Sequence, residues 1–249
     1  MVSAGEASHR ACRLRARAIA PAHLRNLGRW LLLVPHPDDE ALGCGGLLRI
    51  LTSASARPLV VYLTNGAASH QGSPTWPSSR LAAVRRSEAL ASLRLLGVPR
   101  SDVFWLDWPD AKPHASSSLA FATSRDRIRR LCRSTGIRAI ACTWSGEPHC
   151  DHVAAHDLAR AVCGHSITLY EYLVWGWTLS NLTQRLGGRD ILRIDVRETG
   201  VRRKLGLACH RTQLTGLISD AAASFRLPPH MAALTERSTE ILIAQPRRT

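Results

Sequence analysis

Short apolar runs alternate with amphipathic helix patterns along most of the chain. Continuous apolar runs of strand length are typical of parallel strands that are covered on both faces. Such runs lie at residues 29–35, 59–63, 103–106, 137–143, 167–175 and 191–196. We interpret each of them as a strand of one sheet.

Helix patterns fill the intervals between these runs. They cover residues 41–51, 80–96, 117–134, 151–163, 198–210 and 229–237. Gly97 and Pro99 end the second of these helices, and Gly136 closes the third. The regular alternation of strand and helix predicts an α/β fold, with a Rossmann-like, mostly parallel sheet and helices on both of its faces.

The length of the chain fits a single domain. It has 249 residues, of which 45% are apolar, and we find no linker that would divide it. We expect the domain to cover residues 29–249. Residues 1–28 are rich in arginine and lack a long apolar run. They are predicted to form a basic N-terminal arm, either attached to the surface or disordered.

The chain is strongly basic, with a formal net charge of +14. Such an excess can indicate nucleic acid, anionic lipid or acidic substrates as partners. The basic residues are almost all arginine, since only Lys112 and Lys204 are lysines, and dense runs are few. This favours a solvated surface, so we expect no specific nucleic-acid partner. Peripheral membrane contact stays possible, and the oligomeric state is left open.

Cysteine usage indicates a reducing compartment. The seven cysteines are an odd number and form no C-x-x-C pair. The start of the chain lacks signal-peptide architecture, and no apolar run is long enough to span a bilayer. We therefore expect a cytoplasmic protein.

The segment Pro35–Glu40, with the sequence PHPDDE, directly follows the first predicted strand. In an open parallel sheet, ligands bind at the carboxyl ends of the strands. Imidazole and carboxylate groups are good zinc ligands. His36 and a neighbouring aspartate could thus bind one metal ion. A lone Asp-Asp pair would favour the simpler alternative, in which Asp38 or Asp39 caps the next helix. The flanking His36 favours metal binding instead.

A second polar segment, His149-Cys150-Asp151-His152, follows the fourth predicted strand and opens a helix. It should lie at the same edge of the sheet as PHPDDE. A hydrolytic metal site needs three protein ligands and one open position. His36, Asp39 and His152 would supply these ligands. His156 shares a helix face with His152, but a packed histidine is the simpler interpretation.

With these two segments the chain resembles the PIG-L/LmbE family of metal-dependent de-N-acetylases. The family's signatures are A/P-H-P-D-D-E after the first strand and H-x-D-H about a hundred residues later. Weaker matches are Arg85 with Glu88, Leu96-Gly97-Val98, Pro109-Asp110 and His210-Arg211-Thr212-Gln213. The chain departs from the family at Cys150, where proline is usual; the role of this cysteine is left open.

The resemblance implies a hydrolase that removes the N-acetyl group from an N-acetylamino sugar conjugate. One divalent ion would be the cofactor, with Zn²⁺ favoured and Fe²⁺ as the alternative. Asp38 would be the general base that takes a proton from the attacking water. His149 would stabilise the oxyanion or protonate the leaving amine, and Asp151 would orient one of the histidines. Arg85 and Asp110 would bind the substrate.

Two other functions stay open at this point. An amidase that acts on a non-sugar or lipid-linked acyl amide would need the same metal chemistry. A basic nucleic-acid-binding protein is suggested by the charge alone, without a recognisable reader motif.

Overall fold

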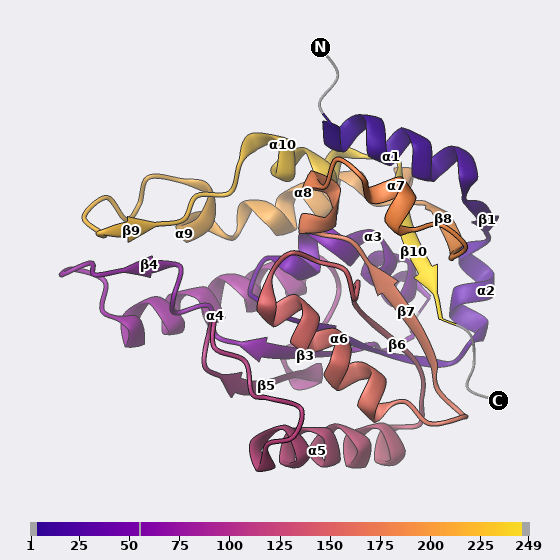
Figure 1. Cartoon of the computed structure of the whole chain (residues 1–249), viewed down its shortest axis with the longest axis horizontal. Coiled ribbons are helices and arrows are strands. Elements are labelled where there is room, and N and C mark those ends of the chain that lie inside the picture. The colour runs from indigo at the N-terminus through magenta and orange to yellow at the C-terminus, as the bar shows by residue number, and fades with distance from the viewer. Residues whose placement is uncertain (1–3, 55, 246–249) are drawn as a thin grey trace.

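The computed structural model describes residues 4–54 and 56–245, and within them a large twisted sheet forms the centre of the molecule (Figure 1). The sheet has eight strands in the order β1-β8-β10-β7-β6-β2-β3-β5. Their bounds are β1 Arg17–Ile19, β2 Arg29–Val34, β3 Leu59–Thr64, β5 Val103–Trp108, β6 Ile137–Thr143, β7 Thr168–Tyr172, β8 Asp190–Asp195 and β10 Thr239–Ala244. Two short strands, β4 His70–Gln71 and β9 Ala223–Ser224, form a separate antiparallel pair.

The sheet is mostly parallel, as predicted. Strands β7, β6, β2, β3 and β5 run parallel to one another, and β1 runs parallel to β8. Within this eight-stranded sheet, β10 lies between β7 and β8 and is antiparallel to both. All six predicted strands are present within a few residues of their expected bounds.

Helices cover both faces of the sheet. Helices α3 Asp39–Ser53, α4 Ser78–Leu95 and α8 Gly200–Ala208 pack together on one face. Helices α5 Leu119–Thr135 and α6 Cys150–Val162 cover the other (Figure 1). The alternation of side chains along β2 explains the two cores: Leu32 packs in the first and Leu33 in the second.

The described part of the N-terminal segment belongs to the sheet and is not a separate arm. Helix α1 Ala4–Arg15 packs on β8, β10 and the turn η2 Trp175–Thr178, and β1 then pairs with β8. Helix α2 Pro21–Asn26 leads into β2. A strand of three residues is too short to leave an alternation in the sequence, which is why the pattern did not predict it. Residues 1–3 of the predicted arm lie outside the described residues.

The C-terminal part differs most from the prediction. The helix expected at 229–237 is split into α10 Pro229–Ala232 and the 3-10 turn η4 Ala233–Glu236. The helix expected at 198–210 is η3 Arg197–Thr199 followed by α8. Short elements η1 Arg100–Asp102, α7 Leu182–Arg185 and α9 Arg211–Leu214 complete the described chain. Strand β10 was not predicted, and residues 246–249 of the predicted domain lie outside the described residues.

Helix α3 bends at Cys44, whose φ of −146° is not helical. The bend frees the backbone N–H groups of Gly46 and Leu47, which donate to the Glu240 carboxylate at 2.6 and 2.8 Å. The Arg203 guanidinium lies 3.1 Å from the same carboxylate. Strand β10 thus supplies the hydrogen-bond acceptor that a bent helix needs.

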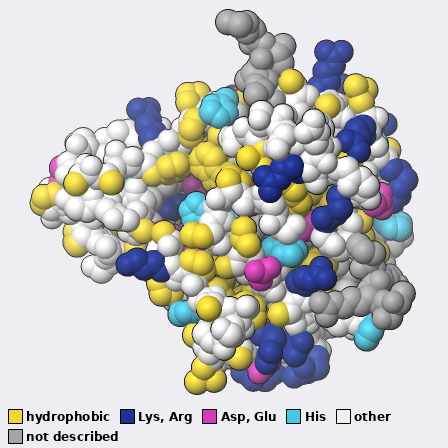
Figure 2. Space-filling view, in the orientation of Figure 1, with side chains coloured by type: hydrophobic (Ala, Val, Ile, Leu, Met, Phe, Trp, Pro, Cys, Tyr) yellow, Lys and Arg dark blue, Asp and Glu magenta, His cyan; other side chains and the backbone are white. Residues whose placement is uncertain are grey.

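On the face of the molecule in Figure 2, basic side chains are spread rather than gathered around one cleft. On the face in Figure 2 they lie at separate places, with a group at the bottom over α5. Among the described helices, none combines the length and the apolar content that crossing a lipid bilayer requires.

Candidate active site

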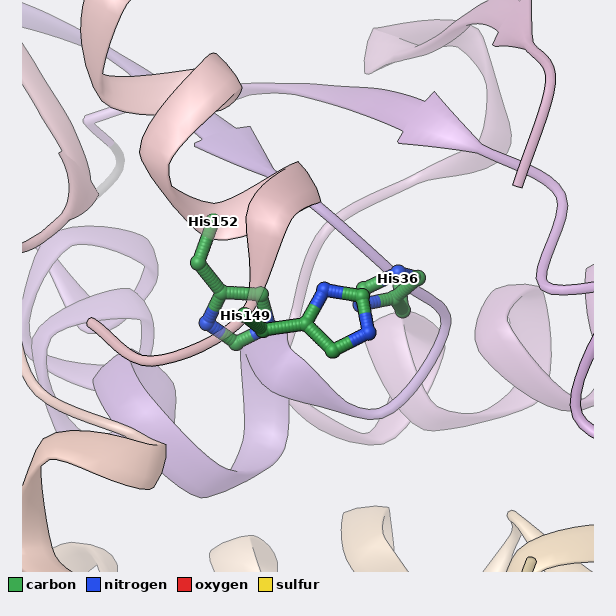
Figure 3. Close-up of side chains that lie close together, drawn as sticks. All are labelled: His36, His149 and His152. Carbon is green, nitrogen blue, oxygen red and sulfur yellow. The ribbon is translucent and has the colours of Figure 1, made fainter. Parts of the chain in front are cut away.

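Two loops meet at the carboxyl ends of β2 and β6, which are neighbours in the sheet. The first loop carries His36 and leads into α3; the second ends at His149, where α6 begins. Figure 3 shows the rings of His36, His149 and His152 turned toward one another across this junction. The predicted convergence of the two motifs is therefore present in the structure. A cavity of about 340 Å³ opens beside them.

Asp38 lines this cavity from an unusual backbone conformation. Its φ is 131°, a value that non-glycine residues rarely adopt. The side chain is buried, and one of its oxygens lies 3.4 Å from the Arg85 guanidinium. The backbone N–H of Asp38 donates to Glu40 at 2.9 Å, which holds the turn. Asp38 is thus not a simple helix cap, because its side chain makes no capping hydrogen bond.

Asp39 lies between two histidines. Its Oδ2 atom is 3.2 Å from His36 Nδ1 and 3.2 Å from His152 Nε2, and the side chain is buried. Ligands bound tetrahedrally to zinc at its usual bond lengths lie about 3.3 Å apart. Each of these two distances therefore fits a pair of ligands on one metal ion.

His152 gives a second indication of a cation. Its Nδ1 atom lies 3.1 Å from Glu147 Oε2. Its Nε2 atom is buried and has no hydrogen-bond partner among the described residues, although Asp39 is near. Burial opposes protonation of His152, but Asp39 and Glu147 outweigh it and raise the pKa of His152 to about 9, so this nitrogen carries a proton toward Asp39 unless a metal cation takes the place of that proton. The residues present thus fit a divalent metal.

Several groups of potential ligand atoms overlap here. The atoms of each group lie within 4.8 Å of one another; the groups are His36, His149 and His152; His149, Cys150 and Asp151; and His36, Asp110 and Asp151. Asp39 is in none of these groups, so geometry alone leaves His149 as a competing third ligand. The His149 side chain is 37% exposed, against 2% for Asp39.

His36 is surrounded by carboxylates. Its Nε2 atom lies 2.9 Å from Asp151 and 3.3 Å from Asp110. Burial opposes protonation, but these carboxylates and Asp39 outweigh it and raise the pKa of His36 well above its usual value. Asp151 also accepts from the Ala111 N–H at 2.8 Å. Asp151 thus joins His36 to the backbone of Ala111.

The protonation of His149 differs from that of His36. It caps α6, with Nδ1 accepting from the Asp151 N–H at 3.2 Å. Burial, together with the nearby His36 and His152, lowers the pKa of His149 to about 4. The ring is therefore neutral near pH 7, and because Nδ1 is an acceptor, Nε2 carries the proton.

The electrostatic environments of the adjacent aspartates differ. Burial raises the pKa of Asp38 to about 6; the charge of Asp39 adds to this effect, and that of Arg85 opposes it. Burial also acts on Asp39, but His152 and His36 outweigh it and lower its pKa below the usual value. One carboxylate is thus held as an anion between histidines, and the other is poised to exchange a proton.

The two predicted substrate-binding residues both line the cavity. The Arg85 guanidinium donates to the Gly66 and Pro37 carbonyls at 2.8 and 2.6 Å, besides contacting Asp38. The Asp110 carboxylate accepts from the Ala68 N–H at 2.6 Å. Arg85 is 3% exposed. These protein partners indicate that Arg85 supports the loop around Asp38, while direct contact with substrate stays a prediction.

Apolar residues complete the cavity. Trp175, Phe225 and Leu227 form an apolar wall of the cavity, and the Trp175 and Phe225 rings meet edge to face at 5.8 Å. Figure 2 shows the surface hollowed between the lobe of β4 and β9 at the left and the main body. Phe225 and Leu227 were not predicted from the sequence, whereas Trp175 and Trp177 flank Gly176 as an aromatic pair that could either stack on a sugar ring or pack in the core.

Two other histidines occupy supporting positions. His210 lies 2.7 Å from the Glu40 carboxylate, which also accepts from the Ser92 hydroxyl. His156 is buried and lies 3.1 Å from Glu171, which agrees with its interpretation as a packed histidine. Cys150 is exposed at the start of α6.

A comparison with protein families identifies this arrangement. The family model described as PIG-L, GlcNAc-PI de-N-acetylase, matches residues 31–163, which include both motifs. The chain belongs to the PIG-L family. The resemblance seen in the sequence is thereby confirmed, and the sheet with its flanking helices is the fold of PIG-L proteins.

Individual PIG-L relatives are distant in sequence. A 1D-myo-inositol 2-acetamido-2-deoxy-α-D-glucopyranoside deacetylase of Corynebacterium efficiens is 28% identical over 200 residues, which are 74% of this chain and 63% of that protein. The chain thus spans less than two thirds of that relative's length.

Solved structures confirm the fold. The deacetylase Dbv21, which acts on the A40926 pseudoaglycone, aligns with a TM-score of 0.66 at 21% identity, over 89% of this chain and 98% of its own. The 4-carboxy-2-hydroxymuconate hydratase GalB of Pseudomonas putida aligns with the same TM-score at 15% identity, over the same shares. Because one of the two is a hydratase, the fold alone does not decide the reaction.

Proposed function

We propose that this chain is a metal-dependent N-deacetylase that hydrolyses an N-acetylamino sugar conjugate to acetate and a free amine. The observation that carries the proposal is the convergence of His36, Asp38 and Asp39 on one cavity, with Asp39 3.2 Å from both His36 and the fully buried His152. Membership of the PIG-L family and the deacetylase among its relatives support the same chemistry.

His36, Asp39 and His152 are the proposed ligands of one divalent ion, with zinc favoured for a mixed nitrogen and oxygen ligand set. We prefer Asp39 to His149 as the third ligand because Asp39 is more deeply buried and lies between the two histidines. When bound, this ion supplies a Lewis acid that polarises the acetamide carbonyl and makes water more acidic.

Asp38 is the proposed general base. Its raised pKa, about 6, matches a group that takes a proton from the attacking water near neutral pH. Water adds to the acetamide carbon, and the carbonyl oxygen becomes an oxyanion. Asp38 then returns the proton to the nitrogen as the C–N bond breaks, which yields acetic acid and the amine.

His149 is the proposed oxyanion donor. The sequence left two roles for it, oxyanion stabilisation and protonation of the amine. Its neutral ring, with Nδ1 accepting from Asp151 and Nε2 protonated, favours hydrogen-bond donation to the oxyanion. Asp151 keeps His36 in place, and Asp110 offers a carboxylate to substrate hydroxyl groups at the cavity wall.

The cavity supports a sugar conjugate as substrate. Its volume of about 340 Å³ is within the range of small-molecule sites. One side carries the polar catalytic groups, while Trp175, Phe225 and Leu227 offer apolar surface to the face of a sugar ring or to an aglycone. On the face in Figure 2 the basic side chains are spread, which favours a small-molecule substrate over a specific nucleic-acid partner. All seven cysteines lie within the described residues and none of them is in a disulfide, which supports a reducing, cytoplasmic location.

A screen for acetate release tests the proposal. Purified protein loaded with Zn²⁺ is incubated with N-acetylglucosaminyl-inositol, other N-acetylglucosaminides and N-acetylated peptides. We expect acetate from at least one sugar conjugate, loss of turnover with a chelator, and recovery with added Zn²⁺. The His152→Ala variant is the control for contaminating activity. Release from N-acetyl peptides and not from sugars would favour the amidase alternative, and no release from any compound would refute the deacetylase.

A further inference from the structure

Glu147 joins two parts of the active site that lie on different elements. It is buried in the loop between β6 and α6. Its Oε2 atom lies 3.1 Å from His152 Nδ1 and accepts from the Trp175 N–H at 2.8 Å. Its Oε1 atom accepts from the N–H groups of Val174 and Gly176, each at 2.9 Å. One carboxylate thus contacts a proposed metal ligand and three consecutive amides of the turn that carries Trp175.

We propose that Glu147 is a positioning residue that fixes the metal-binding nitrogen of His152 and at the same time holds Trp175 in the wall of the substrate cavity. The inference rests on the proposed metal site and deepens it. A carboxylate only accepts hydrogen bonds, so the neutral His152 ring must carry its proton on Nδ1. Nε2 is then left with its lone pair toward Asp39, where the cation fits.

The Glu147 carboxylate also accepts hydrogen bonds from backbone N–H groups in the turn after β7, where the sheet no longer provides acceptors. Val174, Trp175 and Gly176 leave the sheet together, and their N–H groups all point at Glu147. Gly176 approaches so closely that a Cβ atom there would lie 2.8 Å from Glu147 Oε1. A shift of Glu147 would therefore move the Trp175 side of the cavity as well as His152.

Glu147→Gln isolates this role with little change in shape. The amide oxygen can keep the bonds from Val174 and Gly176, but the NH₂ group then faces His152 Nδ1 and donates to it. The His152 proton is driven to Nε2, where it blocks the metal. Removal of such a supporting partner typically costs about 10- to 100-fold in metal affinity. We expect that loss for Zn²⁺, measured by competition with a chelator.

Glu171→Gln is the matched control. Glu171 is another fully buried carboxylate that contacts a histidine, His156, and accepts from a backbone N–H, that of Ser145. It touches none of the proposed ligands. We expect its Zn²⁺ affinity to stay within about threefold of wild type, well short of the effect in Glu147→Gln. Equal Zn²⁺ affinity in Glu147→Gln and wild type, or an equal loss in both variants, would overturn the proposal.

A measurement on the unaltered protein covers the case in which Glu147→Gln does not fold. In ¹⁵N-histidine spectra of the Zn²⁺-loaded chain, His152 should show a protonated Nδ1 and a metal-bound Nε2. The reverse assignment would refute the tautomer. Neither this spectrum nor the zinc titration needs a substrate, so both stand even if acetate release fails.

The effect of Glu147 on the turn that carries Trp175 is tested with zinc-saturated Glu147→Gln, once a substrate is known. With Zn²⁺ in excess, Glu147→Gln should raise KM more than it lowers kcat, because Trp175 loses its hydrogen bond to the carboxylate. An unchanged KM would show that Glu147 does not hold the cavity wall.

Discussion

At the residue scale, two adjacent carboxylates are given different chemistry by their surroundings. Asp39 lies between two histidines, which stabilise its anion. Asp38 is buried beside a single arginine from α4 and keeps a raised pKa. The turn between β2 and α3 sends the two side chains in different directions, so neither can replace the other.

Substitution by asparagine should separate these roles. Asp39→Asn should lose the metal, because a neutral amide is a poorer ligand. Asp38→Asn should keep the metal and lose turnover by about 100- to 10,000-fold, the usual contribution of a general base. Metal analysis and kcat measured on the same preparations check both. Near-normal turnover in metal-loaded Asp38→Asn would show that another group is the base.

At the element scale, the bend of α3 depends on glycines that leave room for neighbouring strands. A Cβ atom on Gly43 would lie 2.3 Å from the Tyr172 ring, in the core between α3 and β7. Tyr172 is fully buried and donates to the Leu33 carbonyl at 3.2 Å, so it has little freedom to move.

Gly43→Ala should therefore destabilise the fold by about 1–3 kcal/mol, the typical cost of overpacking a core. Gly200→Ala is the matched control: Gly200 opens α8 with helical angles and has no atom within 4 Å of an added Cβ. This control should be neutral or gain about 0.5–1 kcal/mol. Urea unfolding measures both free energies, and a Gly43→Ala variant as stable as Gly200→Ala would contradict the packing argument.

The pattern of apolar residues predicted the central strands of the sheet. The six apolar runs gave strands because both faces of a central parallel strand are buried, which leaves an unbroken run of apolar residues. Strand β10 was not predicted, although residues 241–243 form a short apolar run, and its place between β7 and β8 depends on pairing that the local pattern does not show. His36, Asp39 and His152 could be proposed as metal ligands from their motifs, and the structure brings them together. The proposed role of Glu147 could not be predicted, because it depends on a turn 27 to 29 residues away.

At the scale of the whole molecule, the N-terminal segment supports the active site from a distance. The His9 ring meets Trp177 edge-on at 5.2 Å, and His9 Nε2 lies 3.3 Å from the Thr239 carbonyl. Trp177 belongs to the same short turn as Trp175. Helix α1 therefore packs behind one wall of the cavity.

Deletion of residues 1–20 should lower the unfolding temperature and raise KM, because β8 loses its partner β1 and η2 loses its packing against α1. Thermal unfolding and steady-state kinetics measure the two effects. Deletion of residues 1–3 alone is the control, since it keeps every contact described above. If the long deletion behaves like the short one, the segment is the separate arm that the sequence suggested.

The backbone of Asp38 has a consequence for how this chain could be altered by selection or by design. A φ of 131° suits glycine and costs any other residue of the order of 1–3 kcal/mol. A laboratory search that rewards heat tolerance alone should therefore enrich glycine at this position. The resulting variants would be more stable, but they would lack the proposed general base and be inactive. Stability favours glycine at position 38, whereas the proposed general base requires aspartate there. Selection for thermal stability should therefore include an assay of turnover at every round.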